Sequence, residues 1–287
     1  MAAAYEIGKP YFVTARIAYH DSNNRMHSDG LPQKLGFRGP LVLGLATYGN
    51  MTRALAATFG ETWLGHAVID VKFLSVVCEG DKLRVETTPI EGRGDEKAFK
   101  VTAYNESNEG KAAAYMETSM PAVLPPIEPH AAREPNEWEG PVKERRSWDV
   151  IVVDKAYRSL RSTLSVDDNA HWKKVLGDDL PIYYEGKAPA IHPTHVLRQV
   201  QIASGHQYIG DNAVHGSTKA VVRRMLRVGD PIQVLTVPTA KWERKGNHWV
   251  TLYCALRSGG EVCAEMFHTQ IFKLRGTEEP AKSGAQA

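Results

Sequence analysis

An internal repeat constrains this chain more than any other feature of its sequence. The segment Val101–Tyr104 (VTAY) recurs as Val250–Tyr253 (VTLY), 149 positions later. The pair Gly80-Asp81 recurs as Gly229-Asp230 with the same offset. Because several features share one offset, we infer that the 287 residues contain two copies of one structural unit.

Each copy contains one apolar segment of helical length, followed by segments of alternating polarity. In the first copy, Leu41, Leu45, Tyr48, Thr52 and Leu55 recur every three or four residues, which predicts a helix over residues 41–59. The corresponding helix of the second copy is predicted over residues 194–209. Strands are predicted at residues 67–73, 82–88, 99–105 and 112–120, and again at residues 213–226, 232–237, 249–257 and 261–274.

One helix followed by long antiparallel strands and glycine-containing turns predicts a helix wrapped by a curved sheet. This is the hotdog arrangement, so the expected fold class is α+β and the expected architecture is a double hotdog. We expect the sheets of the two halves to join edge to edge. The N-terminal hotdog domain is placed at residues 1–120, a proline-rich linker at 121–146, the C-terminal hotdog domain at 147–275 and a disordered tail at 276–287.

Composition excludes several classes of function. The net charge of +2 argues against a general nucleic-acid-binding surface. The three cysteines, Cys78, Cys254 and Cys263, are too widely spaced for a disulfide framework or a zinc site and fit a reducing compartment. The first residues lack the basic and apolar regions of a signal peptide, and no stretch has the roughly 18 apolar residues of a membrane span. We therefore expect a soluble, cytoplasmic protein without a membrane or nucleic-acid partner.

The densest motif is Asn24-Arg-Met-His27-Ser-Asp29, followed by a glycine-rich run from Leu35 to Gly44 that leads into the first predicted helix. This stretch resembles the active site of MaoC-like (R)-specific enoyl-CoA hydratases and dehydratases. In that family an Asp-x-Asn-Pro-x-His-x-Asp run precedes a glycine-rich turn into the central helix. The resemblance implies a double-hotdog fold and an acyl-thioester substrate, with no metal or other cofactor.

The resemblance also assigns roles to individual residues. Hydration of an enoyl thioester needs one group to activate water, one to handle the proton at the α-carbon, and donors to stabilise an enolate-like oxygen. In the family an Asp/His pair serves the first two roles and a glycine N–H at the helix start serves the third. Here the counterparts are Asp21, His27 and Gly44. The further candidates for oxyanion or substrate binding are Asn24, Asp29, Gly39 and Tyr48.

The sequence departs from the family pattern at several positions. Ser22 aligns with the family's catalytic aspartate, with Asp21 beside it; Arg25 replaces the motif proline, and Leu43 replaces a histidine that often precedes the helix. The motif also stands in the first copy, whereas two-hotdog hydratases commonly carry it in the second.

The second copy lacks the motif and resembles the non-catalytic partner hotdog, which shapes the acyl tunnel. Its candidate pocket residues are His192, His195 and His215, for which helix capping and core packing are the alternative roles. We therefore expect one pocket per pair of copies, bordered by residues 21–29 and 36–44.

The leading hypothesis is a lyase of the hydratase/dehydratase type, acting on an acyl thioester or a related α,β-unsaturated carbonyl compound. A hotdog thioesterase is the alternative enzyme, but it would need a carboxylate on the central helix, and residues 41–59 contain no Asp or Glu. A non-catalytic acyl-binding protein stays open because of Ser22. The expected partner is a small molecule, and assembly into a homo-oligomer is left open.

Overall fold

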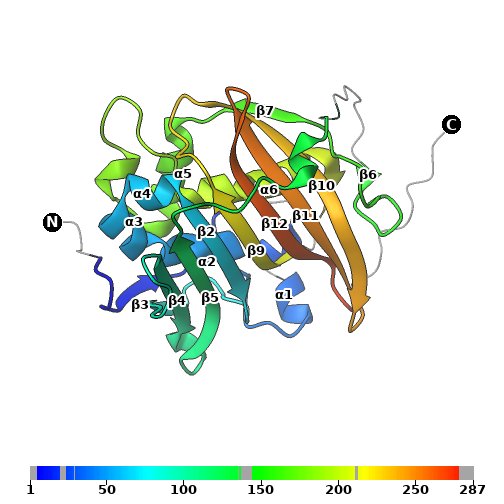
Figure 1. The fold of residues 1–287 in the computed structure, drawn as a ribbon. Coiled ribbons are helices and arrows are strands. Elements are labelled where there is room, and N and C mark those ends of the chain that lie inside the picture. Colours follow the sequence, from blue (N-terminus) through cyan, green and yellow to red (C-terminus); the bar gives the residue numbers. More distant parts are fainter. Residues whose placement is uncertain are drawn as a thin grey trace.

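The structure, a computed structural model, describes residues 5–19, 24–28, 30–134, 136, 144–210 and 213–277. Within these residues the chain forms a ten-stranded antiparallel sheet in the order β1-β3-β4-β5-β2-β9-β12-β11-β10-β7 (Figure 1). The strands are β1 (Tyr11–Thr14), β2 (Ala67–Phe73), β3 (Lys82–Pro89), β4 (Lys97–Asn105), β5 (Lys111–Met120), β7 (Leu160–Thr163), β9 (Val214–Val222), β10 (Pro231–Arg244), β11 (Asn247–Ser258) and β12 (Glu261–Lys273). Two short strands, β6 (Glu144–Arg145) and β8 (Tyr208–Ile209), pair in parallel outside this sheet.

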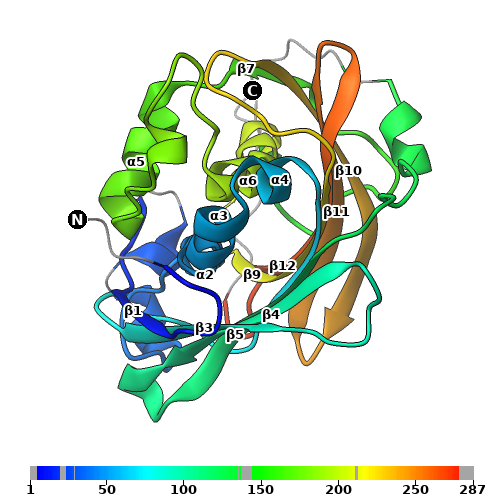
Figure 2. The same cartoon turned by 60° about the vertical axis from the view of Figure 1, so that its left-hand side comes forward.

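The two copies join through their first long strands. β2 of the first copy pairs antiparallel with β9 of the second, from Ala67 opposite Val222 to Lys72 opposite Ser217. Each copy therefore continues the hydrogen-bonded ladder of the other, and the prediction of one continuous sheet is confirmed. Figure 2 shows this sheet curving around the central helices.

The repeat is visible in the hydrogen bonds of two turns. In the first copy the Cys78 N–H donates to the Asp81 carboxylate at 2.9 Å. In the second, the Arg227 N–H donates to the Asp230 carboxylate at 3.0 Å. Both pairs are related by the 149-residue offset of the sequence repeat. The two copies thus share the same local structure.

Six helices and four 3-10 turns accompany the sheet in the described part of the chain. The helices are α1 (Leu31–Lys34), α2 (Gly44–Met51), α3 (Arg53–Phe59), α4 (Glu61–Gly65), α5 (Val166–Leu176) and α6 (Pro193–Gln207), and the 3-10 turns are η1 (Arg25–His27), η2 (Glu106–Asn108), η3 (Pro129–Ala132) and η4 (Pro181–Tyr183). The α2 and α6 helices lie inside the curve of the sheet (Figure 2).

The helix predicted over residues 41–59 begins later than expected. Leu41 forms a β-bridge with Cys78, and the Val42 N–H donates to the Val77 carbonyl at 2.7 Å. These bonds hold residues 41–42 in extended conformation, so α2 can begin only at Gly44. The helical segment is then interrupted at Thr52, where the side-chain hydroxyl donates to the Gly49 carbonyl at 2.9 Å.

Several further elements differ from the sequence-based prediction. The α5 helix was not predicted, although Ser165 and Asp168 form a capping pair at its start: the Asp168 carboxylate accepts from the Ser165 N–H at 2.8 Å. The edge strand β7 was also not predicted. β10 extends to Arg244 instead of ending at 237, because it pairs with β11 as far as Asn247. The linker predicted at 121–146 contains η3 and β6, and its residues 135 and 137–143 lie outside the described part, as do residues 278–287 of the predicted tail.

No helix in the described ranges combines the length and apolar character needed to cross a membrane.

One large apolar core spans both copies. It contains Leu45 and Met51 of α2, Val200 of α6, and inward-facing residues of both halves of the sheet, such as Val101 and Val250. The two copies therefore fold around a shared interior.

The α2 helix of the first copy packs tightly against residues of the second copy at Gly49. A Cβ atom at this position would lie 2.6 Å from Leu176 Cδ1 and would overlap the Thr194 hydroxyl at the start of α6. Thr194 is fully buried, so neither neighbour has room to move away. Gly205, also within a helix, is exposed, and a Cβ atom added there would have nothing within 4 Å.

We therefore expect Gly49→Ala to lower the free energy of unfolding by about 1–3 kcal/mol through overpacking. Gly205→Ala is the matched control and should be neutral or raise it by about 0.5–1 kcal/mol, because alanine is the better helix former. Urea denaturation of both variants checks this expectation. Equal stabilities for the two variants would contradict the tight packing of α2 against α6.

Candidate active site

A cavity of about 1060 Å³ lies between the two copies, beside the beginning of α2. The first copy contributes the segment after β1, the η1 turn, the start of α2 and the residues after β2. The second copy contributes residues of α5, α6, β9, β11 and β12. Of the predicted site residues, Asn24, His27, Gly44 and His215 line this cavity.

His27 is held in one defined orientation by two hydrogen bonds. Its Nδ1 lies 2.6 Å from the Leu41 carbonyl, which can only accept, so Nδ1 carries the proton. Its Nε2 lies 3.1 Å from Nδ2 of Asn24, whose amide also donates to the Ala213 carbonyl at 2.8 Å. An amide NH₂ can only donate, so Nε2 of His27 is the unprotonated nitrogen. This is the tautomer that a general base needs.

Burial keeps the His27 ring neutral. The side chain is 6% exposed. Removal from water lowers the pKa of His27 below its ordinary value of 6.5, and the hydrogen bond to Leu41 offsets only part of this effect. Nε2 therefore stays unprotonated at neutral pH and accepts a hydrogen bond from Asn24.

Gly44 places the N-terminus of α2 at the wall of the same cavity. The first N–H groups of a helix have no acceptor within the helix, and the helix dipole makes this end favourable for negative charge. Leu43, the N-cap residue, offers no side-chain hydrogen bond to them. The site thus combines a base with backbone donors suited to an oxyanion.

Basic groups surround another part of the cavity. Arg16 and Lys174 line it and are exposed, and the Arg198 guanidinium lies 4.0 Å from the centre of the Tyr19 ring. Tyr19 in turn stacks on His171 at 4.4 Å. Sequence reasoning missed this group, because Lys174 and His171 lie on the unpredicted helix α5.

A single carboxylate lines the cavity among the described residues. It belongs to Glu79 and accepts a hydrogen bond from the Ile17 N–H. The walls therefore carry a net positive charge. Among the described residues, no three His, Cys, Asp or Glu side chains gather closely enough to hold a metal ion.

Four of the predicted site residues lie away from the cavity, and two lie outside the described part of the chain. Tyr48 is fully buried in the core and does not line the cavity, and neither does Gly39. His192 and His195 lie in the second copy, away from the cavity lining. Asp21 and Asp29 lie outside the described residues, as does Ser22.

The position of the second copy that corresponds to Gly44 is Pro193, preceded by His192. The N-caps Leu43 and His192 have nearly the same backbone angles, with φ of −55° and −56° and ψ of 133° and 132°. Unlike Leu43, His192 caps its own helix: its Nδ1 accepts from the Thr194 N–H at 3.2 Å.

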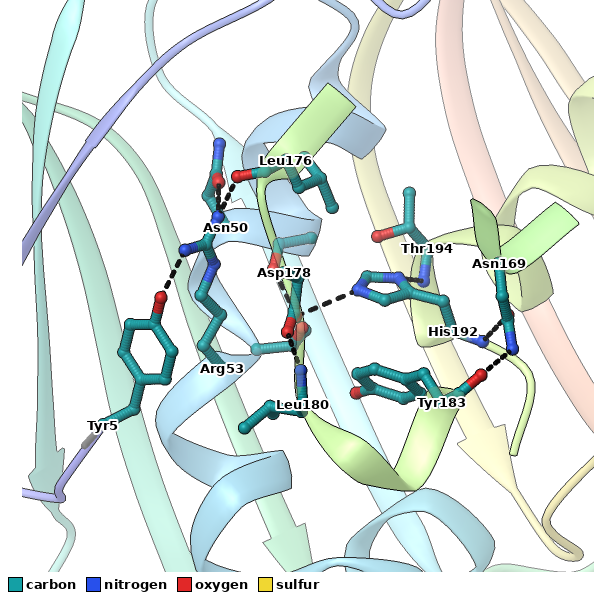
Figure 3. A network of polar contacts seen from close by, with 12 residues as sticks. Tyr5, Asn50, Arg53, Asn169, Leu176, Asp178, Leu180, Tyr183, His192 and Thr194 are labelled. Atoms are coloured by element: carbon teal, nitrogen blue, oxygen red, sulfur yellow. Dashed lines mark hydrogen bonds and ion pairs between the residues drawn. The ribbon is translucent and has the colours of Figure 1, made fainter. Parts of the chain in front are cut away.

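Charged and aromatic side chains pack around His192 (Figure 3). Its Nε2 lies 3.2 Å from the Asp178 carboxylate, and both side chains are fully buried. Burial alone would raise the pKa of Asp178, but the His192 hydrogen bond and the nearby Arg53 charge leave this pKa lowered. The Tyr183 ring lies 4.7 Å from that of His192. His192 therefore serves as a cap and core partner, one of the alternatives left open by the sequence.

His195 has a similar role on the next turn. Its Nε2 lies 2.7 Å from the Gln199 amide and 3.6 Å from the Asp168 carboxylate. Burial lowers the pKa of His195 to about 4, so the ring is neutral and packs as part of the core.

Comparison with solved structures identifies the fold. A MaoC-domain dehydratase from Chloroflexus aurantiacus superposes with a TM-score of 0.63 at 11% identity, covering 95% of this chain and 97% of that one. A conserved Mycobacterium tuberculosis protein described as a double hotdog superposes with a TM-score of 0.62 at 10% identity, covering 93% and 96%. The chain has the double-hotdog fold.

Solved structures described as thioesterases also superpose on this chain. A thioesterase II from Thermobifida fusca superposes with a TM-score of 0.52 at 12% identity, covering 94% of this chain and 96% of that one. No protein-family model matches the sequence. No curated protein sequence matches it either. The superpositions confirm the predicted double-hotdog fold class. Because proteins described as dehydratases and as thioesterases share this fold, the fold alone does not determine the reaction.

The geometry of His27 makes a spectroscopic prediction. In ¹⁵N-histidine spectra at pH 7 we expect Nδ1 of His27 to be protonated and Nε2 to be bare. Because burial lowers its pKa, the ring should stay neutral as the pH falls through 6.5 and should protonate only at lower pH. An Nε2–H tautomer, or a midpoint at or above 6.5, would contradict the assignment.

Proposed function

We propose that this chain is a hydratase/dehydratase-type lyase, acting on an acyl thioester or a related α,β-unsaturated carbonyl compound. One observation carries the proposal: a neutral base, His27, and the free N-terminus of α2 at Gly44 line the same cavity. A hydratase needs both of these elements.

The reaction assigns a task to each element. In the hydration direction, a water gives its hydroxyl to the β-carbon and a proton to a base, the α-carbon gains a proton, and negative charge develops on the thioester oxygen. Nε2 of His27 takes part in the proton transfers, and a bound water or hydroxyl replaces its contact with Asn24. The Gly44 N–H stabilises the oxygen. We propose Asp21, outside the described residues, as the second acid–base group.

The basic groups support an anionic carrier. Arg16 and Lys174 are exposed at the cavity wall, and Arg198 is held on Tyr19. Such groups favour phosphate oxygens, which coenzyme A and acyl-carrier proteins both present on their phosphopantetheine arms. A phosphate-bearing thioester is therefore the proposed substrate class.

A thioesterase is less well supported by the same residues. A hotdog thioesterase would need a carboxylate on the central helix to act as a nucleophile or to activate water. Neither α2 nor α3 contains Asp or Glu, and the carboxylate of Glu79 is already bound to the Ile17 N–H. The hydratase is therefore preferred, although thioesterases share the fold.

A histidine variant tests the proposal. His27→Asn keeps a polar group where Nδ1 bonds to Leu41 but removes the basic Nε2, so we expect turnover to fall by about 10²–10⁴-fold. His66→Gln is the matched control, since His66 also bonds a backbone carbonyl, that of Pro121, but does not line the cavity. The assay follows water addition to a panel of enoyl thioesters, and thiol release from the same panel in parallel.

The outcomes separate the competing functions. Hydration that is lost in His27→Asn and kept in His66→Gln supports the lyase. Thiol release without hydration would identify a thioesterase instead. A parent protein that binds thioesters without turning them over would identify a binding protein.

A further inference from the structure

His215 brings a side chain of the second copy to the start of α2 in the first. It lies on β9, is 9% exposed and lines the cavity. A Cβ atom at Gly44 would lie only 3.0 Å from His215 Nδ1 and 3.1 Å from His215 Cβ. The absence of a side chain at Gly44 therefore lets the imidazole approach the N-terminus of the helix.

The two nitrogens of His215 have different surroundings. Nε2 lies 2.7 Å from the Thr218 hydroxyl, which lies 3.0 Å from Nδ1 of His268. Nδ1, on the side of Gly44, is buried and makes no hydrogen bond of normal geometry, although the Ser217 backbone acts on the ring and offsets part of the pKa lowering caused by burial. Leaving a buried polar atom unpaired costs free energy, and a ligand oxygen bound beside Gly44 would supply the missing partner.

The Thr218 hydroxyl couples the two imidazoles. It has one proton, so it donates to one ring and accepts from the other. When it accepts from His268, it donates to Nε2 of His215, and Nδ1 of His215 then carries a proton. When it donates to His268, Nδ1 of His215 is bare. Both rings are buried, which lowers their pKa values and keeps them neutral, so the choice concerns tautomers and not charge.

We propose that His215 is a further catalytic residue of this site, donating from Nδ1 to the thioester carbonyl oxygen beside the Gly44 N–H. This inference rests on the proposed function. A carbonyl oxygen can only accept, so substrate binding selects the tautomer with a proton on Nδ1. Thr218 and His268 are positioning residues that make this tautomer available without adding charge to the cavity.

Two substitutions of His215 separate the roles of its nitrogens. His215→Gln can still reach Thr218 but has no group in the place of Nδ1. His215→Asn retains an amide near Nδ1 but does not reach Thr218. We expect His215→Gln to lower both kcat and kcat/KM by about 10²–10³-fold, as the loss of an oxyanion donor does. Asn should retain more of the kcat than Gln. A purely structural role predicts the reverse order, because Gln preserves the hydrogen bond present in the protein.

Thr218→Val tests the coupling without changing the shape of the side chain much. In ¹⁵N-histidine spectra of the ligand-free protein, we expect the Nδ1 and Nε2 signals of His215 to shift when the hydroxyl is removed. The loss of kcat should be smaller than in His215→Gln. Melting temperatures of all three variants, and the unchanged ¹⁵N signals of His27, control for loss of the fold.

The combined results distinguish the two proposals. If the parent is active, His27→Asn is inactive and His215→Gln keeps full kcat, the role of His215 is overturned and the proposed function stands. If the parent shows no hydration or dehydration activity, the proposed function fails and this inference fails with it. Activity lost in both His27→Asn and His215→Gln, with the fold retained and Asn the better His215 variant, supports both.

Discussion

The hydrogen-bonded pairing of β2 with β9 determines how the functional groups of the two copies lie relative to one another. It joins two half-sheets into one and sets the register, with Asp70 opposite Lys219. A shift of one residue would turn the side chains of β9 to the opposite face of the sheet. His215 would then no longer meet Gly44. The candidate site is therefore a product of the junction between the copies and belongs to neither copy alone.

In the described part of the chain, a large cavity lies beside the central helix N-terminus of the first copy but not beside that of the second. The copies share their turns and the backbone angles of their helix N-caps, but the side chains at those caps differ. In the first copy, Leu43 leaves the helix N-terminus free beside a cavity. In the second, His192 caps its own helix and bonds to buried Asp178, near Arg53 from the first copy (Figure 3). The start of the second copy's helix, with His192 and Asp178, thus contributes to the stability of the interface between the copies.

Much of the fold could be predicted from the sequence because it depends on local patterns. Alternating polarity located β2 at its observed bounds, and repeated glycine-aspartate turns located the repeat. The start of α2 was missed because Leu41 has helical spacing but bonds to Cys78, which is distant in the sequence. The start of α5 has a local signal in the sequence, because Ser165 and Asp168 have the spacing of a helix-capping pair.

The candidate site was less predictable, since its members meet only through tertiary structure. His27 and Gly44 could be found from a continuous motif. Tyr48 lies on the helix that follows the motif, but its side chain is fully buried in the core shared by the two copies. The proximity of His215 to Gly44 follows from the pairing of β2 with β9, two strands that are far apart in the sequence, and no local pattern indicates it.

We propose one site, built from both copies, that binds the thioester carbonyl at the start of α2. A crystal structure with an unreactive ketone analogue of a saturated acyl coenzyme A, in which a methylene group replaces the sulfur, would test this most directly. We expect one analogue per chain, with its carbonyl oxygen within hydrogen-bonding distance of the Gly44 N–H and His215 Nδ1 and with phosphates near Arg16 and Lys174. An analogue bound at the Asp178–His192 position, or one directed away from Gly44, would contradict it.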